Sequence, residues 1–231
     1  MSEKTLSTHD EKRARARALA AQFAENGDAT GWFDALYKEA AGDNENIPWA
    51  DLEPNRFFSQ WAEKTGLKGN GRKALVVGCG LGDDARYLYD LDFEVTAFDI
   101  SPTAIEWARR LHKDTNIRFE AGDLFQPIRE WLGAFEFVLE IYTIQPLPIE
   151  MRPNVIDAVA GFVAPGGRLV VVTRGREDDE QPDLLPWPLS RKDLYRFVEN
   201  GLTEVGFEEM VDPEDEERRF VVEYLREDRI G

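Results

Sequence analysis

The sequence predicts an α/β protein with a doubly wound, seven-stranded, mostly parallel sheet. The first observation is the continuous apolar run at 74–77, which is typical of a strand buried on both faces of a parallel sheet. The second is a regular alternation of strand and helix patterns from residue 72 onward. The third is a pair of strand patterns near the C-terminal end, which are joined by an acidic turn. This pair predicts an antiparallel hairpin at one edge of the sheet.

The elements of the predicted sheet follow in order along the chain. Strands are expected at 74–77, 93–98, 117–121, 135–141, 168–173, 203–209 and 218–225. Helices are expected at 83–91, 103–112, 151–162 and 191–200. Pro102 opens the second of these helices, with Ser101 as its N-cap, since proline suits the first helical position and serine the cap. The turn Pro165-Gly166-Gly167 ends the third helix before a valine-rich strand.

The first 66 residues have a different pattern and are predicted to be helical. Apolar spacing indicates helices over 10–25 and 31–41, and Pro54 opens a third helix that runs to about residue 65. Three glycines between 66 and 71 then separate these helices from the first strand. We expect residues 1–66 to form an N-terminal helical lid and residues 67–231 to form one compact domain.

Composition narrows the class of protein and its partners. The chain of 231 residues has 45 acidic and 28 basic side chains and a net charge of −17, which disfavours a nucleic-acid partner. The basic cluster at 12–17 is interleaved with alanine and is interpreted as a solvated helix face. No apolar stretch approaches the roughly 18 residues of a membrane span. The lone Cys79 fits a reducing compartment, so we expect a cytoplasmic protein with no membrane partner. One cysteine and two histidines are almost no material for a soft-ligand metal site.

A glycine-rich turn at 78–82 lies between the first strand and the first helix of the sheet. Gly78, Gly80 and Gly82 allow the backbone to approach a ligand closely, although a tight strand-to-helix turn alone has the same pattern. The absence of a lysine at the phosphate position excludes a P-loop. Asp83 and Asp84 follow at the start of the helix and would repel a pyrophosphate, which argues against NAD. The turn suits a cationic or zwitterionic ligand better.

Polar side chains also follow the next three strands. Asp99 ends the second strand, where a carboxylate can accept both ribose hydroxyls; the alternative is a cap for the helix that begins at Pro102. Asp123 follows the third strand and is positioned to receive an adenine amino group. Glu140 and Tyr142 follow the fourth strand. Four successive strand ends with polar groups at one edge predict a ligand crevice.

Together with the turn at 165–167, these residues resemble the class I S-adenosylmethionine-dependent methyltransferases over residues 72–225. The resemblance implies a Rossmann-like fold and S-adenosylmethionine as cofactor. The stretch 47–51, with Pro54-Asn55 and Trp32-Phe33, looks like the thiopurine S-methyltransferase-like branch. That branch includes enzymes that methylate thiols, tellurite and halides, and its N-terminal segment covers the cofactor.

The resemblance also implies the cofactor-binding residues. It places the methionine part of the cofactor against the glycine turn and the ribose at Asp99, with the adenine near Ile100 and Asp123-Leu124. It places Glu140 to Tyr142 on the sulfonium and acceptor side. The full predicted set is Trp32, Trp49, Gly78, Cys79, Gly80, Gly82, Asp83, Asp84, Asp99, Ile100, Ser101, Asp123, Leu124, Glu140 and Ile141. One departure is Val76, which stands where many members of the class have a carboxylate.

The acceptor is expected to be a small molecule, with a thiol or another soft nucleophile favoured. A soft acceptor needs little help from a base, and Glu140 or Tyr142 are the candidates if a base is required, although Tyr142 also fits a pocket wall. Trp32 and Trp49 fit a lid or an ordinary core equally well. The segment 185–189 is a candidate for specificity, and the alternative is a proline-rich motif that binds a partner. The competing hypotheses are an NAD-type oxidoreductase and a non-catalytic S-adenosylmethionine-binding module.

Overall fold

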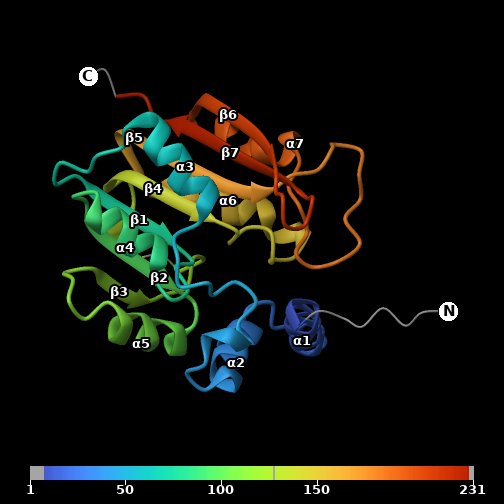
Figure 1. Cartoon of the computed structure of the whole chain (residues 1–231). Coiled ribbons are helices and arrows are strands. Elements are labelled where there is room, and N and C mark those ends of the chain that lie inside the picture. The colour runs from blue at the N-terminus through green and yellow to red at the C-terminus, as the bar shows by residue number, and fades with distance from the viewer. Residues whose placement is uncertain (1–7, 127, 229–231) are drawn as a thin grey trace.

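A seven-stranded sheet with the strand order β3-β2-β1-β4-β5-β7-β6 forms the centre of the molecule (Figure 1). The computed structural model describes residues 8–126 and 128–228. The strands are β1 (Lys73–Val77), β2 (Glu94–Asp99), β3 (Arg118–Ala121), β4 (Phe135–Ile141), β5 (Val163–Arg174), β6 (Thr203–Val211) and β7 (Arg218–Leu225). β1 to β5 pair in parallel, whereas β7 is antiparallel to both β5 and β6. The predicted parallel sheet with an antiparallel edge hairpin is confirmed.

Helices cover both faces of the sheet because the central strands are apolar on both sides. Side chains of α3 (Arg56–Thr65), α4 (Asp83–Asp90) and α5 (Pro102–Leu111) form one core with residues such as Val76 and Phe137. α6 (Arg152–Phe162), α7 (Arg191–Leu194) and α8 (Arg196–Glu199) contribute to the core on the opposite face. Val76 is 3% exposed within the first of these cores, so the position lacks the carboxylate and also lies in the hydrophobic interior.

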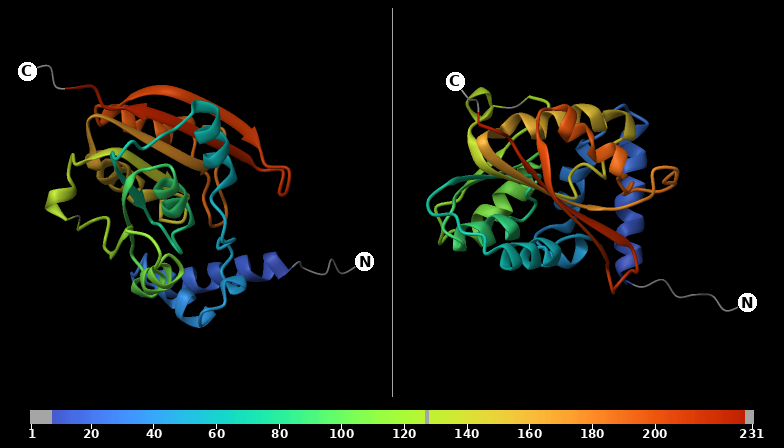
Figure 2. Two further views of the ribbon diagram at one scale, coloured as in Figure 1. Left: turned by 60° about the vertical axis from the view of Figure 1, so that its left-hand side comes forward. Right: turned by 90° about the horizontal axis from the view of Figure 1, so that it is seen from above.

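The first two helices, which precede α3, lie together at one side of the sheet, as the views in Figure 2 show. α1 (Thr8–Ala24) and α2 (Gly31–Ala40) form a third apolar cluster, which includes Leu19 and Tyr37. Leu81 from the glycine turn and Trp107 from α5 belong to the same cluster. The N-terminal segment therefore packs directly against the turn that follows β1.

Several predicted boundaries differ from the structure by one or two residues, and three differences concern a cap, a turn and the continuity of a helix. α3 begins at Arg56, because Asn55 caps it by accepting hydrogen bonds from the amides of Phe57 and Phe58, and Pro54 lies outside. β5 begins at Val163 and continues through the turn at 165–167 with a shift in register. The helix expected at 191–200 is divided at Tyr195 into α7 and α8. Among the described residues, no helix is both long and apolar enough to cross a lipid bilayer.

Candidate active site

The glycine turn places three alternate residues in the left-handed region, with φ of 62°, 53° and 90° at Gly78, Gly80 and Gly82. A Cβ at Gly78 would lie 2.3 Å from Oγ1 of Thr143, which itself donates a hydrogen bond to the Val77 carbonyl. Only glycine fits this position, because both the backbone angle and the close approach exclude a side chain. The turn is therefore packed against the segment that follows β4.

Asp99 lies beneath this turn at the end of β2. Its Oδ2 accepts a hydrogen bond of 2.9 Å from the Gly80 amide, and Oδ1 accepts one of 2.8 Å from the Ser101 amide. The helix cap is Ser101, whose Oγ accepts from the Ala104 amide, so the capping role does not fall to Asp99. Asp99 is 8% exposed, and this burial raises its pKa. The Ile100 amide also hydrogen-bonds to this carboxylate, whose two oxygens have about four lone-pair sites in all.

Asp83 and Asp84 begin α4 directly after the turn. Oδ1 of Asp84 accepts a hydrogen bond of 2.7 Å from the Asn55 amide. Burial raises the pKa of Asp83 to about 6 and that of Asp84 to about 7. Across residues 8–126 and 128–228, no lysine or arginine forms an ion pair with Asp83, Asp84 or Asp99; His112 is 4.0 Å from Asp83. A bound cation would stabilise these carboxylates.

The end of β4 brings the two predicted catalytic candidates to the same edge. Glu140 is fully buried, and its Oε1 accepts from the amides of Thr143 at 2.6 Å and Ile144 at 3.1 Å. Its Oε2 has no hydrogen-bond partner among the described residues, and burial raises its pKa to about 7. These contacts make Glu140 a cap for the turn after β4. Ile141 packs beside the α3–α5 core. The hydroxyl of Tyr142 accepts a hydrogen bond of 3.0 Å from Nε of Arg219.

The predicted adenine residues lie at the end of β3. Asp123 accepts hydrogen bonds from the Phe125 amide and the Gln126 side chain, and so holds its own turn. An open pocket of about 290 Å³ lies beside it, lined by Phe98, Ala121, Gly122, Asp123, Gln126, Ile128, Trp131 and Phe162. Leu124 is 8% exposed within the apolar core. The pocket keeps Asp123 accessible to a planar ligand group.

The predicted aromatic residues of the N-terminal segment have different environments. Trp32 is 2% exposed and stacks on Phe33, so it belongs to the core of the segment, whereas Trp49 is 40% exposed. Nε1 of Trp49 donates a hydrogen bond of 2.9 Å to the hydroxyl of Tyr37. That hydroxyl lies 3.0 Å from the position a Cβ of Gly80 would occupy. Tyr37, which the sequence analysis missed, is thus the aromatic side chain that reaches the glycine turn. Cys79 is half-buried in the turn and packs beside the α3–α5 core.

Residues 74–167 match the family model described as a methyltransferase domain. The chain is 24% identical over 155 residues to 2-heptyl-1-hydroxyquinolin-4(1H)-one methyltransferase of Mycobacteroides abscessus, a match that covers 65% of this chain and 66% of the relative. It is 27% identical over 150 residues to ubiquinone biosynthesis O-methyltransferase of Xanthomonas axonopodis pv. citri, covering 64% and 58%. The chain therefore matches less than two thirds of the length of these curated relatives.

Solved structures share the fold. N-methyltransferase NodS from Bradyrhizobium japonicum, in complex with S-adenosyl-L-homocysteine, has a TM-score of 0.64 at 21% identity and covers 83% of this chain and 96% of its own. The [4+2]-cyclase SpnF has a TM-score of 0.68 at 16% identity, covering 86% and 95%.

The fold of the molecule is Rossmann-like, as in the solved methyltransferase structures, and residues 74–167 match a methyltransferase domain. S-adenosylmethionine is the methyl donor of such a domain. The site fits this group, because a sulfonium and an ammonium are cationic and the carboxylates of Asp83, Asp84 and Asp99 have no lysine or arginine ion pair among the described residues.

Proposed function

We propose that the protein transfers the methyl group of S-adenosylmethionine to a small-molecule acceptor. The observation that carries this proposal is the group of carboxylates at the glycine turn, Asp83, Asp84 and Asp99, which have no lysine or arginine ion pair in the described part of the chain. A pyrophosphate would be repelled here, whereas a sulfonium is attracted. The match of residues 74–167 to a methyltransferase domain also counts against the NAD-type oxidoreductase.

Particular residues would hold the cofactor, which supplies an electrophilic methyl group on its sulfonium. Asp99 would accept the ribose hydroxyls, and Asp123 would meet the adenine with Ile100 and Leu124 beside it. The turn at 78–82 would hold the methionine part. Tyr37 and Trp49 would cover it from the N-terminal segment. Of the predicted lid at residues 1–66, the part before α3 would act in this way over the domain formed by residues 67–231, because α3 packs into the core of the sheet.

The chain's own contribution to the reaction is positioning. Methyl transfer needs the acceptor atom in line with the sulfonium–carbon bond, and correct placement supplies most of the rate acceleration. The turn after β4, capped by Glu140, forms one wall beside the glycine turn. The N-terminal helices pack against the same edge through an apolar cluster that includes Leu81 of the glycine turn. Glu140 is fully buried: Oε1 is occupied by the turn, and Oε2 has no hydrogen-bond partner among the described residues but is closed off from the surface, so the side chain is poorly placed to act as a base.

For the acceptor, we propose a thiol or another soft nucleophile, as in the thiopurine S-methyltransferase-like and tellurite-resistance-like branch. The support is the sequence of 47–51 with Trp32-Phe33 and the shortage of a base, since thiolates need none. A hydroxyl on an aromatic ring is the second candidate, because the names of two relatives specify a hydroxyquinolone substrate and an O-methyltransferase. The single cysteine suits a cytoplasmic location for either acceptor.

The proposal is tested by methyl transfer itself. The protein is incubated with S-adenosylmethionine labelled in the methyl group and with matched aromatic thiols, phenols and amines. Transfer of label to one class, abolished in Asp99→Ala, supports the proposal and identifies the acceptor. If S-adenosylhomocysteine binds but no acceptor is labelled, the non-catalytic binding module is the better account. A structural neighbour that is a cyclase shows that this fold also serves other reactions.

A further inference from the structure

Tyr142 has an unusual backbone conformation for a large residue. Its φ of 57° lies in the left-handed region, where a bulky side chain costs on the order of 1–3 kcal/mol unless its surroundings hold it there. The Tyr142 amide donates to the Val172 carbonyl at 3.1 Å, and the next amide, that of Thr143, donates to Glu140. These contacts fix the turn, and the side chain leaves the end of β4 toward α3 and β7.

The hydroxyl oxygen of Tyr142 has a basic donor from β7 and a polar side chain from the start of α3 close to it. Nε of Arg219 donates to it at 3.0 Å. The side chain of Asn55 acts to lower the pKa of Tyr142, and since Oδ1 of Asn55 is occupied by the amides of Phe57 and Phe58, its NH₂ is the group available to the hydroxyl. A phenol oxygen has two lone pairs and one proton. In the described part of the chain, no protein group accepts that proton.

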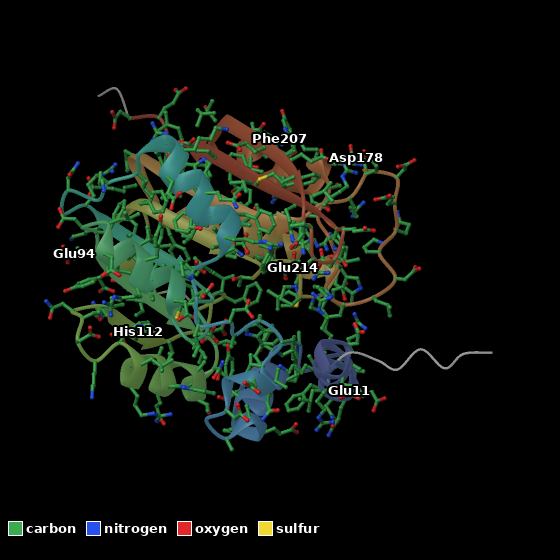
Figure 3. All side chains as sticks on the ribbon, in the orientation of Figure 1. Glu11, Glu94, His112, Asp178, Phe207 and Glu214 are labelled. Atoms are coloured by element: carbon green, nitrogen blue, oxygen red, sulfur yellow. The ribbon has the colours of Figure 1, made fainter. Side chains whose placement is uncertain are left out.

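Arg219 is held rigidly. It is 3% exposed, and its Nη2 binds Asp212 at 3.0 Å and Asp215 at 2.7 Å, both in the segment that joins β6 to β7. Figure 3 shows many nitrogen- and oxygen-bearing side chains around Glu214 in this segment. Because the planar guanidinium is fixed on three sides, the hydroxyl of Tyr142 is fixed as well.

Contacts of neighbouring residues link the surroundings of this hydroxyl to the candidate active site. The backbone amide of Asn55 donates to Asp84. Thr143, the next residue after Tyr142, lies against Gly78 of the glycine turn. Burial raises the pKa of Tyr142 although Arg219 and Asn55 act in the opposite direction, so the side chain is a phenol at neutral pH. It can donate a hydrogen bond but does not act as a base there.

We propose that Tyr142 orients the methyl acceptor by donating its hydroxyl hydrogen bond to the reacting atom, an anionic oxygen or sulfur, with Arg219 and Asn55 as positioning residues. The inference rests on the proposed methyl transfer. The acceptor loses its proton to solvent before the transfer. The acceptor atom then forms its bond to the methyl carbon while the carbon–sulfur bond of the donor breaks, and the sulfur takes the electron pair. Tyr142 keeps its proton throughout.

Calorimetric titration of protein saturated with S-adenosylhomocysteine tests this assignment. Three probes of one shape are compared at pH 8: 4-nitrophenol, 4-nitrothiophenol and 4-nitrotoluene. The wild type should bind one or both anions at least about tenfold more tightly than the toluene, since a hydrogen bond to a charged group has about that effect. Tyr142→Phe should reduce the preference to within about twofold. The stronger of the two anions identifies oxygen or sulfur as the acceptor.

Variants of the neighbours separate orientation from folding. Asn55→Ser keeps a helix cap but removes the NH₂ donor, and Arg219→Lys keeps the charge but removes the fork; both should lower the preference several-fold. Arg174→Lys alters the same charged cluster, because Arg174 pairs with Asp215 and Glu217, and this variant should leave the preference for the anions unchanged. A wild-type preference in Tyr142→Phe overturns the assignment, as does equal or absent binding of all three probes. Failure of S-adenosylhomocysteine to bind would instead overturn the proposed function.

Discussion

Oδ1 of Asp34, in α2, accepts a hydrogen bond of 2.7 Å from Oγ of Ser101, the N-cap of α5. The same oxygen accepts from the Thr103 amide at 3.1 Å, and Lys38 pairs with the other oxygen. Burial acts to raise the pKa of Asp34, but the hydrogen bonds from Lys38, Ser101 and Thr103 outweigh it and hold the pKa at about 2. The N-terminal segment is thus attached to the sheet two residues from Asp99.

Replacing Asp34 should weaken the attachment of α2 to the start of α5. Asp34→Ala is expected to lower the free energy of unfolding by about 1–2 kcal/mol at pH 7, because it removes two hydrogen bonds to a carboxylate at a helix start. Since the folded pKa is depressed, the wild-type advantage should be complete above about pH 4 and disappear as the pH falls toward 2. Urea unfolding measures both effects. Glu39→Ala, which removes an exposed pair with Arg15, is the control, and an equal loss there would contradict the attachment.

The glycine turn should reject a side chain at Gly78 more strongly than elsewhere. Gly71 has a similar φ of 73° but open space where a Cβ would lie. Gly71→Ala should cost about 1 kcal/mol of backbone strain, and Gly78→Ala about 1–3 kcal/mol more, because its Cβ displaces Thr143. Thermal and urea unfolding of the pair measure the difference. Similar stabilities would show that the turn relaxes and that close packing does not hold it.

Arg152 should fix the segment 185–189. The side chain is 3% exposed, donates to the Trp187 carbonyl at 2.6 Å and pairs with Asp193 at 3.0 Å. Arg152→Met should cost about 1–3 kcal/mol in urea unfolding, since it leaves the Trp187 carbonyl without its donor, although Arg176 and the Ser190 amide still donate to Asp193. Arg196→Met removes a more exposed pair with Asp157 and should cost clearly less. The account is wrong if the two variants lose the same stability.

The carboxylates of the glycine turn should make the ligand-free protein less stable at higher pH. Asp84 has a pKa of about 7 when folded, raised by burial, so the folded state binds more protons than the unfolded state between about pH 4 and 7. Its contribution to stability therefore falls as the pH rises through that window. Asp84→Asn, which keeps an acceptor for the Asn55 amide, should flatten this dependence and gain about 1–2 kcal/mol at pH 8. Urea unfolding from pH 5 to 8 that shows the same slope in both proteins would contradict it.

Local features of the sequence predicted most of the fold. The apolar run of β1, the glycine turn and the Ser101-Pro102 start of α5 are each encoded within a few neighbouring residues. They are also what the family model and the solved structures share with this chain. The break at Tyr195 was not predicted, because one continuous helix and two short helices in succession have nearly the same apolar pattern.

Parts of the candidate site depend on contacts between distant segments, and the sequence does not reveal these. Tyr142 and Arg219 are 77 residues apart and meet only because β7 returns beside β5. The two arginines directly after the acidic run at 214–217 were the available signal for Arg219, but the partner of each arginine depends on the register of the hairpin. Tyr37 was missed in favour of Trp32 because the buried face of α2 is set by its packing against α5.

The central claim is that the carboxylates around the glycine turn bind S-adenosylmethionine. Calorimetric titration with S-adenosylhomocysteine tests it most directly, with NADH as the competing ligand and Asp179→Asn, in an exposed loop, as the control variant. We predict that wild type and control bind S-adenosylhomocysteine but not NADH, and that Asp99→Ala binds at least about tenfold more weakly, since it loses charged hydrogen bonds to the ribose. Binding of NADH in place of S-adenosylhomocysteine, or full affinity in Asp99→Ala, would contradict the account.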